Sequence, residues 1–153
     1  IVALFVDAPE ALVREVLAAV PPGLLQFHGN ESPADCARYQ RPFLKALRMA
    51  PELAVEEAAA AYAAASGILL DSYRPGVPGG TGETFDWERA PAALRSRLVL
   101  AGGLTPENVG EAIARVRPAA VDVSGGVEAS PGVKDAGRIA AFAAAVGDAD
   151  SGR

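Results

Sequence analysis

The sequence predicts an α/β fold in which helices cover a parallel β-sheet. Short runs of apolar and β-branched residues alternate along the chain with longer stretches that are rich in Ala, Leu and Glu. The short runs are apolar at consecutive positions, which is typical of strands that are buried on both faces. Because a helical stretch follows each run, the strands are expected to lie parallel to one another.

Six strands and six helices are expected in alternation. The strands are predicted over residues 1–6, 24–28, 43–48, 67–71, 97–102 and 120–124, and the helices near 9–20, 32–40, 52–65, 86–94, 106–116 and 135–146. Pro33 and Pro106 suit the first turn of a helix, where a missing N–H leaves no hydrogen bond unmade. Thr105, Asp86 and Asp135 are candidate N-caps, because their side-chain oxygens can accept from the free N–H groups of a first turn.

The length of the chain limits how such a sheet can close. The 153 residues are enough for one domain with a hydrophobic core. We expect this domain over residues 1–146, followed by a frayed polar C-terminal tail over 147–153. Helix-covered parallel sheets occur as doubly wound sheets or as (βα) barrels. A complete barrel takes about 250 residues, so the six βα units predicted here would need two more to close one.

Composition and charge exclude several classes of function. The net charge of −5 and the pI near 4.9 argue against a nucleic-acid surface, which needs a basic patch. No apolar run approaches the length of a membrane helix, so no membrane partner is expected. The first ten residues have neither a basic leader nor a cleavage site, although they begin inside a predicted core strand. One Cys and one His give no disulfide and no metal framework, and the cytoplasm is the expected compartment.

Polar residues collect where the predicted strands end. In parallel α/β folds the chemistry lies at the carboxyl ends of strands, so residues there are candidates for a site. Taken singly, each is as readily a turn former or a helix cap. The candidates are Asp7, Gln26, His28, Gly29, Arg48, Asp71, Gly102, Gly103, Asp122, Ser124, Gly125 and Gly126.

Two of these strand ends carry paired glycines. Gly102 and Gly103 lie between a strand and a capped helix, and the segment 124–126 (Ser-Gly-Gly) repeats the arrangement after the next strand. Glycines let the backbone approach a ligand closely, and successive N–H groups can surround an anion. A short helix starting near Val127 would direct its positive end to the same place. The two loops therefore predict a phosphate site, with simple tight turns as the alternative.

Asp71 is a candidate general acid. It ends the apolar run Ile68–Leu70 and precedes a loop, residues 78–87, whose glycines would let it close over a ligand as a lid. Burial disfavours the charged form of a carboxylic acid, so an Asp at this place can hold a proton and deliver it near neutral pH. The alternative is that Asp71 accepts backbone N–H groups of its own loop, which would favour the charged form instead.

Several other residues are open to more than one interpretation. His28 could serve a site or be a hydrogen-bonded structural residue, and Lys45 could point into a barrel or outward towards a helix. The role of Arg48 is left open. Cys36 falls in a predicted helix and is interpreted as a small buried hydrophobe. Phe85 and Trp87 are expected to pack against the core and not to contact a ligand.

Five segments together resemble the phosphoribosylanthranilate isomerase family of tryptophan biosynthesis. They are LLQFHGNE, ILLDSY, GGTGETFDW, LAGGLTPENV and VDVSGGVEASPGVKD, and the likeness runs from Ile1 to about Val146. The resemblance implies a (βα)8 TIM barrel and an Amadori rearrangement of an N-linked phosphoribosyl aminoaldose to an aminoketose, without a metal or an organic cofactor. In this family an acid protonates the ribose ring oxygen, the ring opens to an imine, and a base removes the C2′ proton.

The resemblance also assigns roles to individual residues. Asp71 matches the general acid of the family, and Asp122 matches a polar residue near the sugar. His28 matches a position in an HG motif and receives no definite role. The phosphate loops are matched by Gly102, Gly103, Ser124, Gly125 and Gly126.

The chain departs from the family pattern in its first part. The general base of the family is a Cys in a K-x-C-G motif on the first strand, and an Arg follows the second strand; neither is found here. The segment IVALFVD aligns with the third strand of the family, so we expect an incomplete barrel of about six βα units that is inactive alone. The alternatives are another sugar-phosphate barrel and a non-catalytic phosphate-binding module. The oligomeric state is not predicted.

Overall fold

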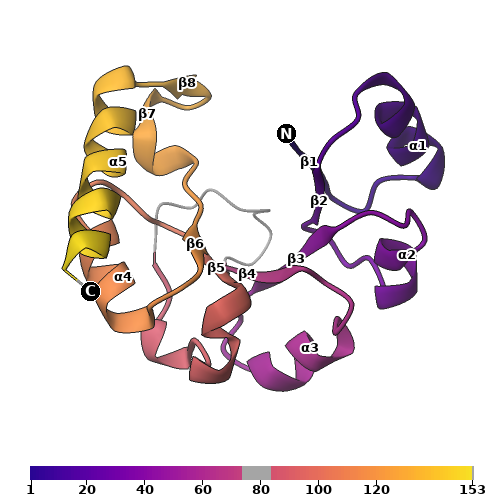
Figure 1. Ribbon diagram of the computed structural model, residues 1–153, viewed down its shortest axis with the longest axis horizontal. Coiled ribbons are helices and arrows are strands. Elements are labelled where there is room, and N and C mark those ends of the chain that lie inside the picture. Colours follow the sequence, from indigo (N-terminus) through magenta and orange to yellow (C-terminus); the bar gives the residue numbers. More distant parts are fainter. Residues whose placement is uncertain (74–83, 153) are drawn as a thin grey trace.

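A curved six-stranded parallel sheet forms the centre of the molecule. The computed structural model describes residues 1–73 and 84–152. The strands are paired in chain order and all pairs are parallel, as the sequence predicts. Figure 1 shows the sheet curling through part of a circle, with β1 and β6 at its two ends. The strands are β1 (Val2–Phe5), β2 (Leu24–Phe27), β3 (Phe43–Arg48), β4 (Gly67–Asp71), β5 (Leu98–Leu100) and β6 (Ala120–Val121).

The helices lie on the convex side of this sheet (Figure 1). Two of the predicted caps are confirmed: the Asp135 side chain accepts from the Arg138 N–H at 2.8 Å, and Asp86 accepts from the Glu88 N–H at 3.1 Å. None of the helices in the described part of the chain is long and apolar enough to cross a membrane. The α-helices are α1 (Glu10–Ala19), α2 (Pro33–Ala37), α3 (Val55–Ala61), α4 (Val109–Val116) and α5 (Ala136–Ser151).

The prediction of one α-helix over 86–94 was wrong. Two 3₁₀ helices stand there, η1 (Trp87–Arg89) and η2 (Ala92–Arg97). Pro91 separates them, because the residue before a proline is pushed out of the helical region. Ala90 accordingly has an extended backbone, with φ −77° and ψ 115°.

The start of α4 is also later than predicted. Thr105–Asn108 form a turn, and the N-cap of α4 is Asn108 and not Thr105. The Thr105 hydroxyl still accepts from the Glu107 N–H at 3.2 Å, while the Asn108 side chain accepts from the Thr105 N–H at 2.8 Å. These local bonds stabilise the turn in place of a first helical turn.

The C-terminal part contains two further differences. The segment from 147, expected to be a frayed tail, continues α5 as far as Ser151, whose hydroxyl donates to the Gly147 carbonyl at 2.9 Å. A hairpin that the sequence analysis did not predict joins β7 (Glu128–Ser130) to β8 (Val133–Lys134). Its turn places Gly132 at a φ of +79°, a conformation that glycine adopts without strain.

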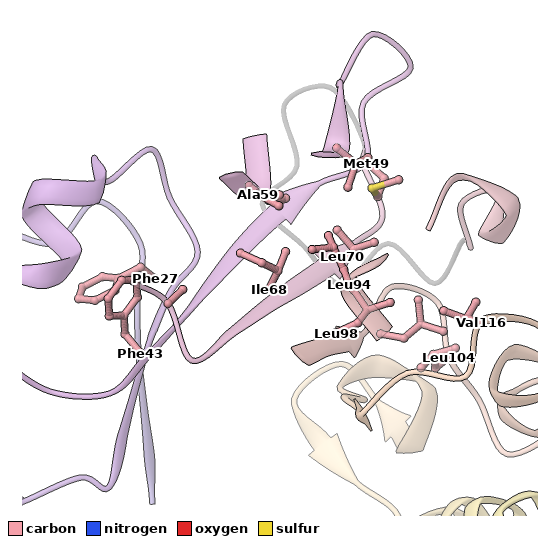
Figure 2. Packing of buried hydrophobic residues seen from close by; sticks show 14 of the residues in the cluster. Phe27, Phe43, Met49, Ala59, Ile68, Leu70, Leu94, Leu98, Leu104 and Val116 are labelled. Carbon is pink, nitrogen blue, oxygen red and sulfur yellow. The ribbon is translucent and has the colours of Figure 1, made fainter. Parts of the chain in front are cut away.

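The two faces of the sheet carry different cores. The convex face is large and apolar: Phe27, Phe43, Ile68, Leu70 and Leu98 pack beneath the helices (Figure 2). The concave face holds a smaller cluster in which Val99 packs against Ala46, Leu69 and Ala101. Since side chains alternate between faces along a strand, this concave face also receives the polar residues at the strand ends.

Candidate active site

A cavity of about 320 Å³ opens at the carboxyl ends of the strands, on the concave side of the sheet. Apolar side chains of β1 and the end of β5 form part of its wall, and Gln26 and Arg48 contribute polar groups. Ten of the twelve strand-end candidates line this one cavity, and Asp7 and Gly29 do not. Besides Gln26 and Arg48, the ten include the eight residues that the family resemblance assigns to the site: His28, Asp71, Gly102, Gly103, Asp122, Ser124, Gly125 and Gly126.

Side chains point to alternate faces along a strand, and this alternation explains why these side chains meet. Gln26 and His28 lie two residues apart at the end of β2, so both point to the concave face while Phe27 points to the helices. Arg48 of β3 lies opposite Asp71 of β4 in the register of the two strands, and its side chain lies on the same face. A shift of one residue in register would send the whole set to the opposite side.

Asp71 is buried and fully hydrogen-bonded through its carboxylate. Only 5% of the residue is exposed. Its Oδ2 lies 3.0 Å from Nε2 of His28, and its Oδ1 accepts from the Ser72 N–H at 2.8 Å. The carboxylate therefore combines the two arrangements considered from the sequence, because it is buried at an apolar strand end and also accepts an N–H of its own loop.

A second carboxyl group, Asp122, faces the same cavity. Burial in the cavity, and after it the neighbouring Asp71 carboxylate, raise the pKa of Asp122 above its usual range. The charges of His28 and Lys134 act in the opposite direction and are the smaller influence. Although the Asp122 side chain remains accessible to solvent, it holds a proton more readily than an isolated aspartate.

The two glycine loops pack against each other without space for side chains. Gly102 and Gly103 have φ angles of +79° and +63°. A Cβ on Gly102 would lie 2.4 Å from the Ser72 nitrogen, and one on Gly126 would lie 1.8 Å from the carbonyl oxygen of Leu104. The predicted short helix is η3 (Gly125–Val127), a single 3₁₀ turn. Glycine is therefore required where the backbones approach most closely.

Two basic residues donate hydrogen bonds to backbone carbonyls of the second glycine loop. The sequence analysis did not identify them. Lys134 Nζ donates to the Ser124 carbonyl at 2.9 Å and pairs with Glu128 at 2.7 Å. Arg138 Nε donates to the Gly126 carbonyl at 3.2 Å. The sequence feature that could have identified Lys134 and Arg138 is their position beside Asp135, the predicted N-cap, which places both next to the start of α5.

Of three further residues considered in the sequence analysis, two lie away from the cavity and one lines it. Lys45 points outward, where its ammonium donates to the Gly29 carbonyl at 2.6 Å and pairs with Glu31 at 3.0 Å. Cys36 is buried as predicted, and burial raises the pKa of its thiol to about 11. Arg48 does line the cavity and donates to the His28 carbonyl at 3.2 Å.

The predicted lid falls mostly outside the described residues, which exclude 74–83. Phe85 and Trp87, at its end, pack against the apolar core as the sequence analysis expected. Among residues 1–73 and 84–152, no group of three or more His, Cys, Asp or Glu side chains is arranged to hold a metal ion.

Comparison with known proteins agrees with this architecture. Residues 1–145 match the family model described as N-(5'phosphoribosyl)anthranilate (PRA) isomerase. The N-(5'-phosphoribosyl)anthranilate isomerase of Thiobacillus denitrificans is 60% identical over 141 residues, which are 92% of this chain and 69% of the relative.

The chain belongs to the phosphoribosylanthranilate isomerase family. The crystal structure of phosphoribosyl anthranilate isomerase from Thermotoga maritima superposes with a TM-score of 0.81 at 39% identity, covering 96% of this chain and 72% of that one. A phosphoribosyl anthranilate isomerase in complex with reduced 1-(o-carboxyphenylamino)-1-deoxyribulose 5-phosphate gives a TM-score of 0.75 at 38% identity, covering 92% and 68%. The curled parallel sheet is thus the barrel-like fold of this isomerase family.

Proposed function

We propose that this chain carries the acid and phosphate-binding part of a phosphoribosylanthranilate isomerase site. The observation that carries the proposal is the single cavity in which a buried carboxylate, Asp71, faces two glycine loops from consecutive strands. The reaction would be the Amadori rearrangement of N-(5-phosphoribosyl)anthranilate to 1-(2-carboxyphenylamino)-1-deoxyribulose 5-phosphate. Its substrate is a small phosphorylated sugar derivative, which suits a cavity of about 320 Å³.

In the proposed mechanism Asp71 is the general acid. A proton moves from its carboxyl group to the ribose ring oxygen, the C1′–O bond breaks, and the nitrogen lone pair forms the imine. Removal of the C2′ proton by a base then gives the enol form of the aminoketose. His28 is hydrogen-bonded to the Asp71 carboxylate. Asp122 lines the same cavity as Asp71, and we assign it a place beside the sugar.

The phosphate group is assigned to the two glycine loops. Gly102 and Gly103 form one side, and the Ser124–Gly126 loop forms the other. Positive φ angles and the absence of side chains let backbone N–H groups approach an anion. Lys134 adds a positive charge at Ser124, in a protein whose overall charge is negative.

The base for the second proton transfer is proposed to lie outside this sequence. Cys36 is the only cysteine in the chain, and its buried position and raised pKa make it unsuitable. The side chains of Leu4 and Val6 line the cavity and are 55% and 45% exposed, so the sheet offers an apolar surface beside β1. We assign this surface to two further βα units that complete the barrel between β1 and β6.

The decisive experiment follows the loss of phosphoribosylanthranilate fluorescence. We expect no turnover by the 153-residue chain alone, and turnover when the two N-terminal βα units of the Thiobacillus denitrificans relative are added as a separate polypeptide. In that mixture Asp71→Asn should lower kcat by about 10²–10⁴-fold with little change in KM. Turnover by the chain alone would disprove the proposal that the base lies outside this sequence. Binding of the substrate without turnover in the mixture would favour a non-catalytic phosphate-binding module.

A further inference from the structure

A buried glutamine stands behind the proposed acid, and the mechanism above gives it no role. Gln26 lies on the concave face at the end of β2 and is only 7% exposed. Its Nε2 is 3.2 Å from Nδ1 of His28, and Nε2 of His28 is 3.0 Å from Oδ2 of Asp71. Three side chains from β2 and β4 therefore form one hydrogen-bonded row that ends at the cavity.

The donors in this row determine where the proton of the imidazole lies. In the orientation seen here the amide nitrogen of Gln26 faces Nδ1 of His28, and in that orientation the amide donates and Nδ1 accepts. The proton of a neutral imidazole then lies on Nε2 and is donated to Asp71. The Ser72 N–H donates to the other oxygen at 2.8 Å, so in this arrangement both oxygens of Asp71 accept hydrogen bonds.

When the His28–Asp71 pair takes up one proton, Nδ1 changes from a hydrogen-bond acceptor to a donor. If the proton stays on the ring, the imidazolium carries hydrogen on both nitrogens. If Asp71 keeps it, the carboxyl group donates to Nε2 and the ring hydrogen moves to Nδ1. In both cases Nδ1 becomes a donor, and the Gln26 amide must turn to present Oε1. Glutamine can serve both states because one end of its amide donates and the other accepts, whereas glutamate or methionine cannot.

We propose that Gln26 is a positioning residue that pairs His28 in both protonation states of the His28–Asp71 pair by turning its amide. The inference rests on the proposed role of Asp71 as the acid, which must lose and regain a proton in every turnover. Without such a partner, one of the two states would leave a ring nitrogen unpaired on a side chain that is only 14% exposed, which is unfavourable.

Other charged groups near the pair do not replace this function. Arg48 of β3 donates to the His28 carbonyl and not to the ring. Asp122, after β6, lines the same cavity, and its pKa is affected by the charges of Asp71, His28 and Lys134. These charges change how readily the pair takes up a proton, but only Gln26 contacts Nδ1 in the described residues.

The test uses the fact that His28 is the only histidine in the sequence. In the 153-residue chain labelled with ¹⁵N-histidine, two-bond ¹H–¹⁵N spectra report which ring nitrogen carries hydrogen. Above about pH 8, where an ordinary imidazole is neutral, we expect hydrogen on Nε2 alone. Gln26→Glu, which only accepts, should move hydrogen onto Nδ1 at the same pH, and Gln26→Met should give a mixture of tautomers. The matched control Gln40→Glu, at an exposed position, should leave the spectrum unchanged.

Two results would overturn the proposal: hydrogen on Nδ1 of the unsubstituted chain at high pH, or an unchanged ring spectrum in folded Gln26→Glu. If the variants do not fold, acidifying the unsubstituted chain decides. The side-chain amide signals of Gln26 must then shift over the same pH range in which Nδ1 gains its hydrogen, and a constant amide signal refutes the turn. None of these readouts uses turnover, so the Asp71→Asn assay can fail or succeed independently.

Discussion

Gly126→Ala is expected to separate the two loops that form the proposed phosphate site. The new methyl group would lie 1.8 Å from the Leu104 carbonyl oxygen, 2.9 Å from its carbonyl carbon and 3.2 Å from Cα of Thr105. Carbon and oxygen atoms in ordinary contact are about 3.3 Å or more apart. All three neighbours are backbone atoms, so no side chain can rotate away and the loops themselves must move.

The size of the effect follows from that displacement. Forcing an extra methyl group into a packed site typically costs about 1–3 kcal/mol. In a protein of this size each kcal/mol lowers Tm by about 2–4 °C, so we expect a decrease in Tm of about 2–12 °C. The separated loops should also bind inorganic phosphate more weakly, since their N–H groups would no longer converge.

Gly110→Ala is the matched control. Gly110 lies in α4, and a Cβ there would have no atom within 4 Å. Alanine is favoured over glycine inside a helix by up to about 1 kcal/mol, so Tm should stay level or rise. Thermal unfolding and a phosphate titration followed by backbone amide shifts measure both effects. Gly126→Ala with the Tm and phosphate affinity of the unsubstituted chain would refute the tight packing of the loops.

Three further predictions concern charge and titration. Lys45→Met leaves the buried carboxylate of Glu31 without its cation and should lower the free energy of unfolding in urea by about 3–5 kcal/mol, whereas Arg115→Met, at an exposed ion pair, should change it by less than about 1 kcal/mol. In the folded state the pKa of the Cys36 thiol is raised from 9.0 to about 11. The contribution of the neutral thiol to the free energy of unfolding is therefore complete below pH 9 and is lost as the pH rises to about 11. In that pH range the free energy of unfolding should decline less for Cys36→Ala than for the unsubstituted chain. Because its pKa is raised in the folded state, Asp122 destabilises the fold once it ionises, and Asp122→Asn should raise Tm at pH 7 while leaving Tm at pH 3 nearly unchanged.

The strands and their facing could be predicted from the sequence because they depend on local pattern. Apolar runs such as Ile68–Leu70 identify the strands, and the alternation of side chains then places His28 and Asp71 on one face. The parallel direction of the strands follows from the intervening helices, whereas their pairing in chain order is what the resemblance to a barrel family implies. Ten of the twelve strand-end candidates accordingly line one cavity, while Asp7 and Gly29 do not.

The remaining features depend on contacts that a linear pattern does not show. The direction of Lys45 is determined by Gly29 and Glu31, which lie on another strand end. The breakdown of the predicted helix at Pro91 could have been recognised from the proline, but α4 begins late because of side-chain bonds within one turn. The bonds of Lys134 and Arg138 to the glycine loop require the hairpin, whose strands are too short to show a period.

The Glu31 carboxylate has a consequence for engineering this fold. It accepts from the N–H groups of Asp7 and Gly29 and from the ammonium of Lys45, and so it joins the segments after β1 and β2 to a side chain of β3. Replacing a buried charge cluster by apolar side chains of similar volume is often neutral or stabilising. Here such a redesign would release the backbone that carries His28, so a library selected for thermal stability alone would yield stable proteins in which the proposed site is distorted.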